Sequence, residues 1–289
     1  MHTIPAGIRQ RYPEDRRTDA QIREHYELEK RLAERLKAST VEERQELYGR
    51  CYDELYASLP HHPRHSRQTS EQQLAQHVAS QMQVLEQFLK PDAVFVEVGS
   101  GDGSLLRAVA PRVRAAYGIE VSAITATTSV NVQPRNAVSV IYDGQTLPFQ
   151  QQRVTLVFSN AVMEHLHPDD AFEQIRGIAQ TLAPGGKYVF YTPHRFMGPG
   201  DVSKYFDTVA TGFHLKEYTY RELRRLLRAA GYSSVAGLVR FRGRYRVVPI
   251  AVLILNELVL SLLPYGIRHK LAWNRLMQRL VQIRIVAAR

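Results

Sequence analysis

Three glycines at alternating positions, Gly99, Gly101 and Gly103, stand where a short apolar run ends. The run, residues 94–98, is rich in β-branched and aromatic side chains, and residues 105–109 after the glycines have the pattern of a starting helix. Glycines in such a turn allow positive φ and let a ligand approach the main chain without meeting a Cβ. Because ligands of open α/β sheets bind at the carboxyl ends of the strands, the pattern predicts a site for a nucleotide-like cofactor.

The residues around these glycines narrow the kind of cofactor. A dinucleotide turn, G-x-G-x-x-G, would have its third glycine at position 104, where Ser104 stands, and a P-loop would end in a lysine that is missing here. Glu97 lies inside the end of the predicted strand. A carboxylate there repels a pyrophosphate but accepts hydrogen bonds from an ammonium group. The turn therefore favours a cofactor with a cationic amino-acid part.

Polar residues also follow the next predicted strands. Glu120 ends the second strand, where a carboxylate suits the two hydroxyls of a ribose. Asp143 and Gly144 follow the third strand, and Asn160 ends the fourth, residues 153–160. Asp143 before a glycine is also an ordinary turn residue, so both roles stay open for it.

This ordered set resembles the class I S-adenosylmethionine-dependent methyltransferases, and within them the group that modifies quinones, sugars and natural products. The resemblance covers about residues 90–240. Residues 97–103 match the cofactor motif, and residues 147–149 and 184–186 match further motifs at the expected order and distance.

The resemblance implies the cofactor S-adenosyl-L-methionine and a set of residues that hold it. The glycines would line its methionine part, Glu97 would hold the amino group and Glu120 the ribose. Asp143 with the backbone of Gly144 would reach the adenine amine, and Asn160 would lie under the methionine end. The implied cofactor-binding residues are Glu97, Gly99, Ser100, Gly101, Gly103, Glu120, Asp143, Gly144 and Asn160.

The implied reaction is methyl transfer to a small-molecule acceptor such as a lipid, quinone, sugar or natural product. If the acceptor atom is a hydroxyl, a general base adds rate. His165 follows the fourth strand and is the first candidate, with His214 and then His194 on acceptor-side loops. His165 could equally be a helix-start residue that bonds the backbone. The sequence identifies neither the acceptor nor the methylated atom.

The implied fold is α/β, a Rossmann-like seven-stranded, mostly parallel sheet with an antiparallel last strand at residues 281–287. Capping-box spacing at Thr18 and Thr40, followed by apolar residues at helical period, predicts an N-terminal helical cap over residues 1–89. Residues 90–289 would form the methyltransferase domain, with a helical insert at 248–280.

The charge is unevenly distributed along the chain. The net charge is +10, and residues 195–289 carry 17 Lys and Arg against 5 Asp and Glu. This indicates an anionic acceptor, an anionic membrane surface or RNA, or simply solvated helix faces. Residues 247–263 are almost wholly apolar and are flanked by arginines. They suit peripheral membrane contact, a homodimer contact or burial against the core.

The remaining features exclude several classes. Cys51 is the single cysteine and the first 17 residues are polar, which predicts a reducing, cytoplasmic location without a signal peptide. His61, His62 and His65 lie among prolines with no cysteine or carboxylate nearby, so no metal site is predicted. Residues 159–162 lack the Asn/Asp-Pro-Pro motif, which weakens base methylation, although the basic C-terminal third keeps an RNA methyltransferase as an alternative. A non-catalytic scaffold that keeps the cofactor fold is the other rival interpretation.

Overall fold

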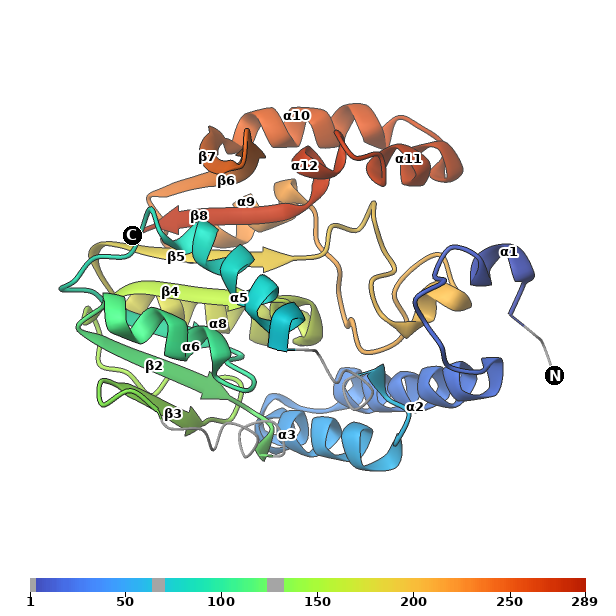
Figure 1. The fold of residues 1–289 in the computed structure, drawn as a ribbon, viewed down its shortest axis with the longest axis horizontal. Helices are drawn as coiled ribbons and strands as arrows, with labels where there is room; N and C mark the ends of the chain where they lie inside the picture. Colours follow the sequence, from blue (N-terminus) through green and yellow to red (C-terminus); the bar gives the residue numbers. More distant parts are fainter. Residues whose placement is uncertain (1–3, 64–70, 124–132) are drawn as a thin grey trace.

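The computed structural model describes residues 4–63, 71–123 and 133–289. Its described strands form one sheet in the order β3-β2-β1-β4-β5-β8-β6-β7 (Figure 1). The strands are β1 Val94–Val98, β2 Ala115–Glu120, β3 Ala137–Ile141, β4 Val154–Asn160, β5 Leu182–Thr192, β6 Ser234–Phe241, β7 Arg244–Pro249 and β8 Ile283–Ala288. The first five pair in parallel, and β8 lies antiparallel between β5 and β6.

The Rossmann-like architecture with a late antiparallel strand is confirmed, but the predicted number of seven strands is wrong. The described chain has an eighth, β7, which pairs antiparallel with β6. Arg242 and Gly243 join the two strands with φ of 47° and 81°, the two positive values that a type I′ hairpin turn requires. The sequence prediction took Arg242, Arg244 and Arg246 as residues that flank a helix. However, residues 244–248 also have the β-branched and aromatic character of a strand.

Apolar side chains cover both faces of the sheet. Phe95 packs with α5 (Glu71–Leu85) and α6 (Ser104–Val109), whereas Val96 and Val98 point to the opposite face. That face packs against α8 (Pro168–Thr181) and α9 (Tyr220–Ala229). This alternation has the period of two that a strand buried on both faces needs. The described short elements are α1 Ala6–Arg9, η1 Ala110–Arg112, η2 Met163–His165 and η3 Val202–Tyr205.

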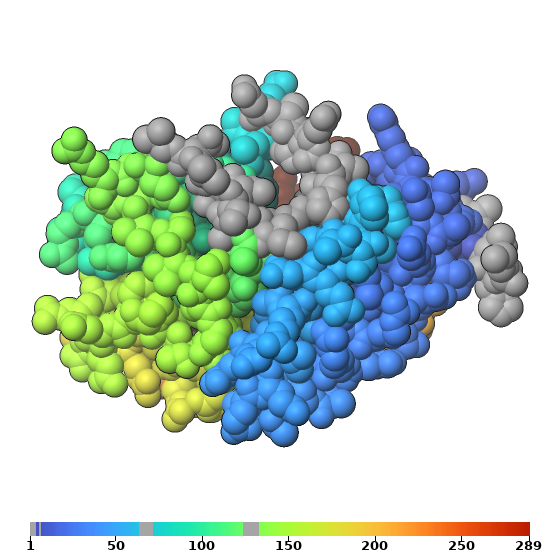
Figure 2. Space-filling model, turned by 90° about the horizontal axis from the view of Figure 1, so that it is seen from below, coloured from blue at the N-terminus to red at the C-terminus, as the bar shows by residue number. Residues whose placement is uncertain are grey.

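Helices α2 (Asp19–Ala38) and α3 (Val41–Ser58) lie at the end of the sheet towards which β2 runs (Figure 1). Both begin with the predicted capping boxes, at Thr18 and Thr40. The blue N-terminal helices pack directly against the green middle of the chain in Figure 2. The helical layer is therefore part of the same packed body as the sheet.

A buried ion pair fixes α3 to α8. The Arg44 guanidinium donates to both carboxylate oxygens of Asp170, at 2.6 and 2.8 Å. The Tyr48 hydroxyl donates to the same carboxylate at 2.6 Å and accepts from the backbone N–H of His167 at 2.8 Å. All four hydrogen bonds join the two helical segments across the interior.

The predicted helical insert is present between β7 and β8. It consists of α10 (Ile250–Ser261), α11 (Tyr265–Ala272) and α12 (Gln278–Val281), and α10 and α11 form an outer layer beyond β6 and β8 (Figure 1). Glu257 ties α10 to the core, because its carboxylate accepts from the backbone N–H of Tyr220 at 2.6 Å and from the His194 ring at 3.1 Å. The predicted apolar run therefore begins in β7 and becomes a helix only after Pro249.

Candidate functional site

A cavity of about 1320 Å³ lies where β1, β2 and β4 end. It is bounded by the glycine turn on one side and by α3 and α5 on the other. Of the residues predicted for the site, the structure brings together Glu97, Gly99, Ser100, Gly101, Glu120, Asn160 and His165 in the lining of this cavity. Their convergence follows from the parallel strands, whose carboxyl ends meet at one edge.

The glycine turn has the conformation that its residues indicate. Gly99, Gly101 and Gly103 have φ of 72°, 55° and 70°. A Cβ on Gly99 would lie 2.6 Å from Cγ2 of Val162, so a side chain has no room there. The backbone N–H groups of Gly99 and Ser100 donate to the carbonyl of Ile119 at 2.8 and 3.1 Å, which fixes the turn against β2.

Glu120 stands over the glycine turn. Its Oε2 accepts from the backbone N–H of Gly101 at 2.9 Å, and its Oε1 accepts from Val121 at 2.8 Å and from Ser122 at 3.2 Å. These bonds hold the carboxylate at the cavity wall, next to the turn. The position suits a ribose whose hydroxyls donate to an acid at the end of the second strand.

Glu97 offers a direct test of whether the lining fits the implied cofactor. Its side chain is 6% exposed, and its Oε2 has no hydrogen-bond partner among the described residues. Burial raises the pKa of this carboxyl well above 4.5, and the charges of Asp102 and Glu120 raise it further. A buried carboxyl oxygen without a partner in a cavity wall is costly unless a cation or a donor completes it. The ammonium group of S-adenosylmethionine has that chemistry, so the residues present fit the cofactor.

Gly103, Asp143 and Gly144 lie at the site's margin rather than in the cavity lining. Gly103 is the N-cap residue of α6, and a Cβ on Gly144 would lie 3.0 Å from Cδ2 of Tyr48. Asp143 Oδ1 accepts from the backbone N–H groups of Gln145 at 2.8 Å and Thr146 at 2.7 Å. Asp143 thus has the geometry of an ordinary turn residue, which was one of the two roles expected for it. Its role towards adenine stays a prediction.

The ring of His165 has a defined orientation at the cavity. Its Nδ1 lies 2.9 Å from the carbonyl oxygen of Phe213, which can only accept, so Nδ1 carries the proton and Nε2 keeps its lone pair. Burial lowers the pKa of His165 to about 4, and the neighbouring His214 contributes to the shift. The imidazole is therefore neutral at physiological pH, with an acceptor nitrogen available.

His214 lies behind His165 instead of in the cavity lining, with 4.8 Å between the two ring centroids. Burial opposes its charged form, but the hydrogen bond to Glu217 (2.8 Å) and the charges of Glu164 and Asp201 raise its pKa to about 9. His214 is thus a cation at neutral pH, next to the neutral His165. His194, the remaining candidate, is buried against Glu257 of α10 and away from the cavity.

Aromatic residues complete the wall. From the sequence, the tyrosines of α3 could line the acceptor pocket, although such a spacing is more often typical of core packing. Tyr48, Tyr52 and Tyr56 repeat every four residues along α3, a spacing that shows a common face but not what the face meets. Tyr142 follows β3 and was not singled out. Among the described lining residues, the acidic side chains are those of Glu14, Glu97, Asp102 and Glu120, and none is Lys or Arg. The cavity is therefore acidic in a basic protein.

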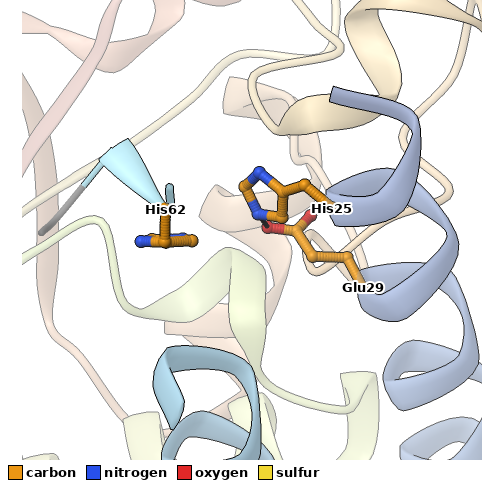
Figure 3. Close-up of side chains that lie close together, drawn as sticks. All are labelled: His25, Glu29 and His62. Atoms are coloured by element: carbon orange, nitrogen blue, oxygen red, sulfur yellow. Dashed lines mark hydrogen bonds and ion pairs between the residues drawn. The ribbon is translucent and has the colours of Figure 1, made fainter. Parts of the chain in front are cut away.

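Two described clusters have residue types that bind metals, His25 with Glu29 and His62, and Glu164 with His165 and His214. In the first, both histidines and the carboxylate approach one another from α2 and the segment after α3 (Figure 3). Arg17 donates to Nδ1 of His25, and Nε2 of His25 donates to Glu29 at 2.8 Å. Both ring nitrogens of His25 therefore already have hydrogen-bond partners, and the Arg17 guanidinium places a positive charge beside them. We assign no metal to either cluster.

Of the other two histidines in this segment, His61 and His65, only His61 lies among the described residues. His61 bonds the carbonyl of Gln21 on α2 at 3.1 Å. His65 lies outside the described residues.

Comparison with known proteins gives one family. A family model described as a methyltransferase domain matches residues 67–236. No curated protein matches the chain. Among solved structures, a chain of the complex between the Haloferax volcanii Trm112 methyltransferase activator and a methyltransferase is 13% identical, with a TM-score of 0.52 over 76% of this chain and 94% of the other.

A second solved structure is Haemonchus contortus phosphoethanolamine N-methyltransferase 1 with phosphoethanolamine and S-adenosylhomocysteine. It is 16% identical, with a TM-score of 0.56 over 86% of this chain and 50% of the other. This chain therefore spans half the length of that enzyme. At such identities the likeness to both structures concerns the fold.

Proposed function

The chain belongs to the class I S-adenosylmethionine-dependent methyltransferases, and from this premise we propose that it methylates a hydroxyl of a small, uncharged acceptor with His165 as the general base. The observation that carries the proposal is the orientation of His165, whose Nδ1 is occupied by the Phe213 carbonyl and whose Nε2 is free to accept a proton. A neutral imidazole in this orientation can take the proton of a hydroxyl as the methyl group is transferred.

The lining of the cavity supports an acceptor without negative charge. Tyr48, Tyr52, Tyr56 and Tyr142 provide aromatic surface, whereas a phosphate would need the Lys or Arg side chains that the described lining lacks. A phenol, a quinol or a comparable apolar alcohol fits these walls. The same argument disfavours RNA, because the basic residues of β7 and α11 do not line the cavity.

Each group in the mechanism has one task. Bound S-adenosylmethionine supplies an electrophilic methyl group on its sulfonium. Glu97 and Glu120 hold the cofactor's polar ends beside the glycine turn. The tyrosines orient the acceptor and exclude water, so that alignment provides much of the rate. His165 takes the acceptor's proton on Nε2, and the protonated His214 behind it keeps the pKa of His165 low.

We also propose that residues 1–89 act as a cap that completes the acceptor pocket and that residues 90–289 form the transferase domain. The tyrosines of α3 and Gln81 of α5, which line the cavity, support this division. A cytoplasmic location agrees with Cys51, a buried free thiol.

Replacement of His165 tests the proposal. We expect His165→Ala and His165→Gln to lower kcat for a phenolic acceptor about 100-fold or more. Calorimetry should show S-adenosylhomocysteine binding with unchanged affinity in both variants. His61→Ala, on α2's side of the molecule and bonded to a backbone carbonyl, is the control. Unchanged turnover in the His165 variants would remove the base, and failure of the wild-type protein to bind the cofactor would remove the methyltransferase mechanism itself.

A further inference from the structure

The outer face of α10 exposes apolar side chains to water. Its exposed apolar residues, with the one that follows the helix, are Val252, Leu255, Leu258, Val259 and Leu262. Leu255 is 63% exposed and Leu262 is 83% exposed. The one charged residue of the helix, Glu257, points inward and is buried. A surface helix normally presents polar residues to water, so this face indicates a partner.

The apolar surface continues over α11 and the turn after it. Tyr265, Ile267, Leu271, Trp273 and Leu276 are all exposed. Tyrosine and tryptophan at the border of an apolar surface are typical of the region where lipid headgroups meet the hydrocarbon core. We call the ten exposed apolar residues of α10, α11 and the adjoining turns the docking face.

The charge around the docking face identifies the partner. Residues 240–289 contain ten Lys and Arg and a single acid, Glu257, which is paired inside the protein. Arg244, Arg246, Lys270, Arg275 and Arg279 are exposed around the face. A symmetric contact between two copies would bring these cations together, which costs free energy. An anionic lipid surface neutralises them instead.

We propose that α10 and α11 dock the protein on a bilayer surface that contains anionic phospholipids. The helix lies in the plane of the interface, since its 12 residues span about 18 Å, well short of the roughly 30 Å hydrocarbon core. Among the described helices, none combines the length and apolarity that a membrane crossing requires. The leucines of α10 enter the headgroup region, and the arginines and Lys270 bind phosphates beside them.

The docking face contacts the segment after β5, which is linked to the cavity residue His165 through Glu217 and His214. The Trp273 indole N–H donates to the carbonyl of Met197 at 3.1 Å, and the Arg268 guanidinium lies 4.6 Å from the ring centre of Phe196. Both partners belong to the segment after β5, in which Gly200 donates to Glu217 at 2.7 Å. Docking thus places this side of the molecule next to the bilayer, where an apolar acceptor is concentrated. Membrane binding itself is separate from the proposed chemistry.

Vesicle flotation with the full-length protein tests the proposal. We expect binding to vesicles of phosphatidylcholine with phosphatidylglycerol, weak binding to phosphatidylcholine alone, and loss of binding at high salt. Leu255→Asp and Leu262→Asp should each weaken binding about tenfold. Val41→Asp, at a 46% exposed valine on α3, is the matched control and should bind like the wild type. Circular dichroism shows that each variant is folded.

Three results would overturn the proposal. The first is equal binding to both vesicle types, which would remove the role of the cations. The second is a wild-type dimer in solution that Leu255→Asp converts to a monomer, which would make the face a contact between copies. The third is a monomeric wild-type protein that binds neither vesicle. None of these results depends on turnover, so the methyltransferase proposal would stand in each case.

Discussion

Replacement of Glu97 by glutamine should move stability and cofactor binding in opposite directions. The buried carboxyl has a raised pKa, so it keeps its proton in the folded protein at a pH where the unfolded chain has already lost it. Its contribution to stability is therefore unfavourable above pH 4.5 and absent well below that value. Glu97→Gln removes this penalty without changing the shape of the side chain.

The size of the effect has a ceiling set by the pH. The penalty grows by about 1.4 kcal/mol for each pH unit above 4.5 until the pH reaches the pKa of the folded state, which gives at most about 3.5 kcal/mol at pH 7. With cofactor present the wild type gains more stability than the variant, since a charge-assisted hydrogen bond from the ammonium group contributes about 1.5–3 kcal/mol to it. The Kd for S-adenosylhomocysteine should therefore rise about 10- to 150-fold in Glu97→Gln.

Urea unfolding at pH 7 and at pH 4, with and without S-adenosylhomocysteine, measures both parts. The ligand-free variant should be more stable than the wild type at pH 7 and equal to it at pH 4. With saturating ligand at pH 7 it should gain less stability than the wild type. A variant that is less stable at both pH values, or that binds the ligand with unchanged affinity, would refute the assignment of Glu97 to the cofactor.

Three further predictions concern other residues. Glu120→Ala should weaken S-adenosylhomocysteine binding about tenfold or more in calorimetry, because its carboxylate stands at the glycine turn. Asp143→Ala should have a smaller effect, and the reverse order would give Asp143 the main role. Asp170→Ala should cost about 3–5 kcal/mol of unfolding free energy by leaving Arg44 unpaired, whereas the exposed neighbour Asp169→Ala should cost little. The kcat/KM for the acceptor should stay level from neutral pH down to about pH 5 and fall as the pH approaches 4, where the His165 imidazole gains a proton; a fall near pH 6.5 would contradict the burial of that ring.

The parts of the site that depend on short stretches of chain could be predicted from the sequence. Gly99 to Gly103, Glu120 and Asn160 follow strands whose apolar character is local, and parallel pairing then brings their ends together. The orientation of His165 could not be predicted, because its partner is a carbonyl 48 residues away. The same holds for Tyr48, whose bond to Asp170 joins residues 122 positions apart.

Strand β7 was missed for a different reason. Its arginines alternate with Tyr245 and Val247 over only four residues. Because β7 lies at the edge of the sheet and is largely exposed, the alternation of apolar and polar residues that marks a strand is weak. The sequence does contain one signal for a hairpin, which is Gly243 between the apolar residues of β6 and those of β7. Only the positive φ of Gly243 in the structure shows that this glycine forms the turn.

The position of the insert bears on how proteins of this kind diverge. Gly237 of β6 and Ile285 of β8 face each other in neighbouring antiparallel strands, so the chain leaves the β6–β8 pairing and returns to it at one place. The intervening residues, including β7, α10 and α11, form an insertion between two paired strands. Such an insertion can be shortened, lengthened or replaced without a change in the order of the other strands. A change in the length or sequence of this segment would then alter the outer surface of the molecule without moving the ends of β1, β2 and β4, where the cavity lies.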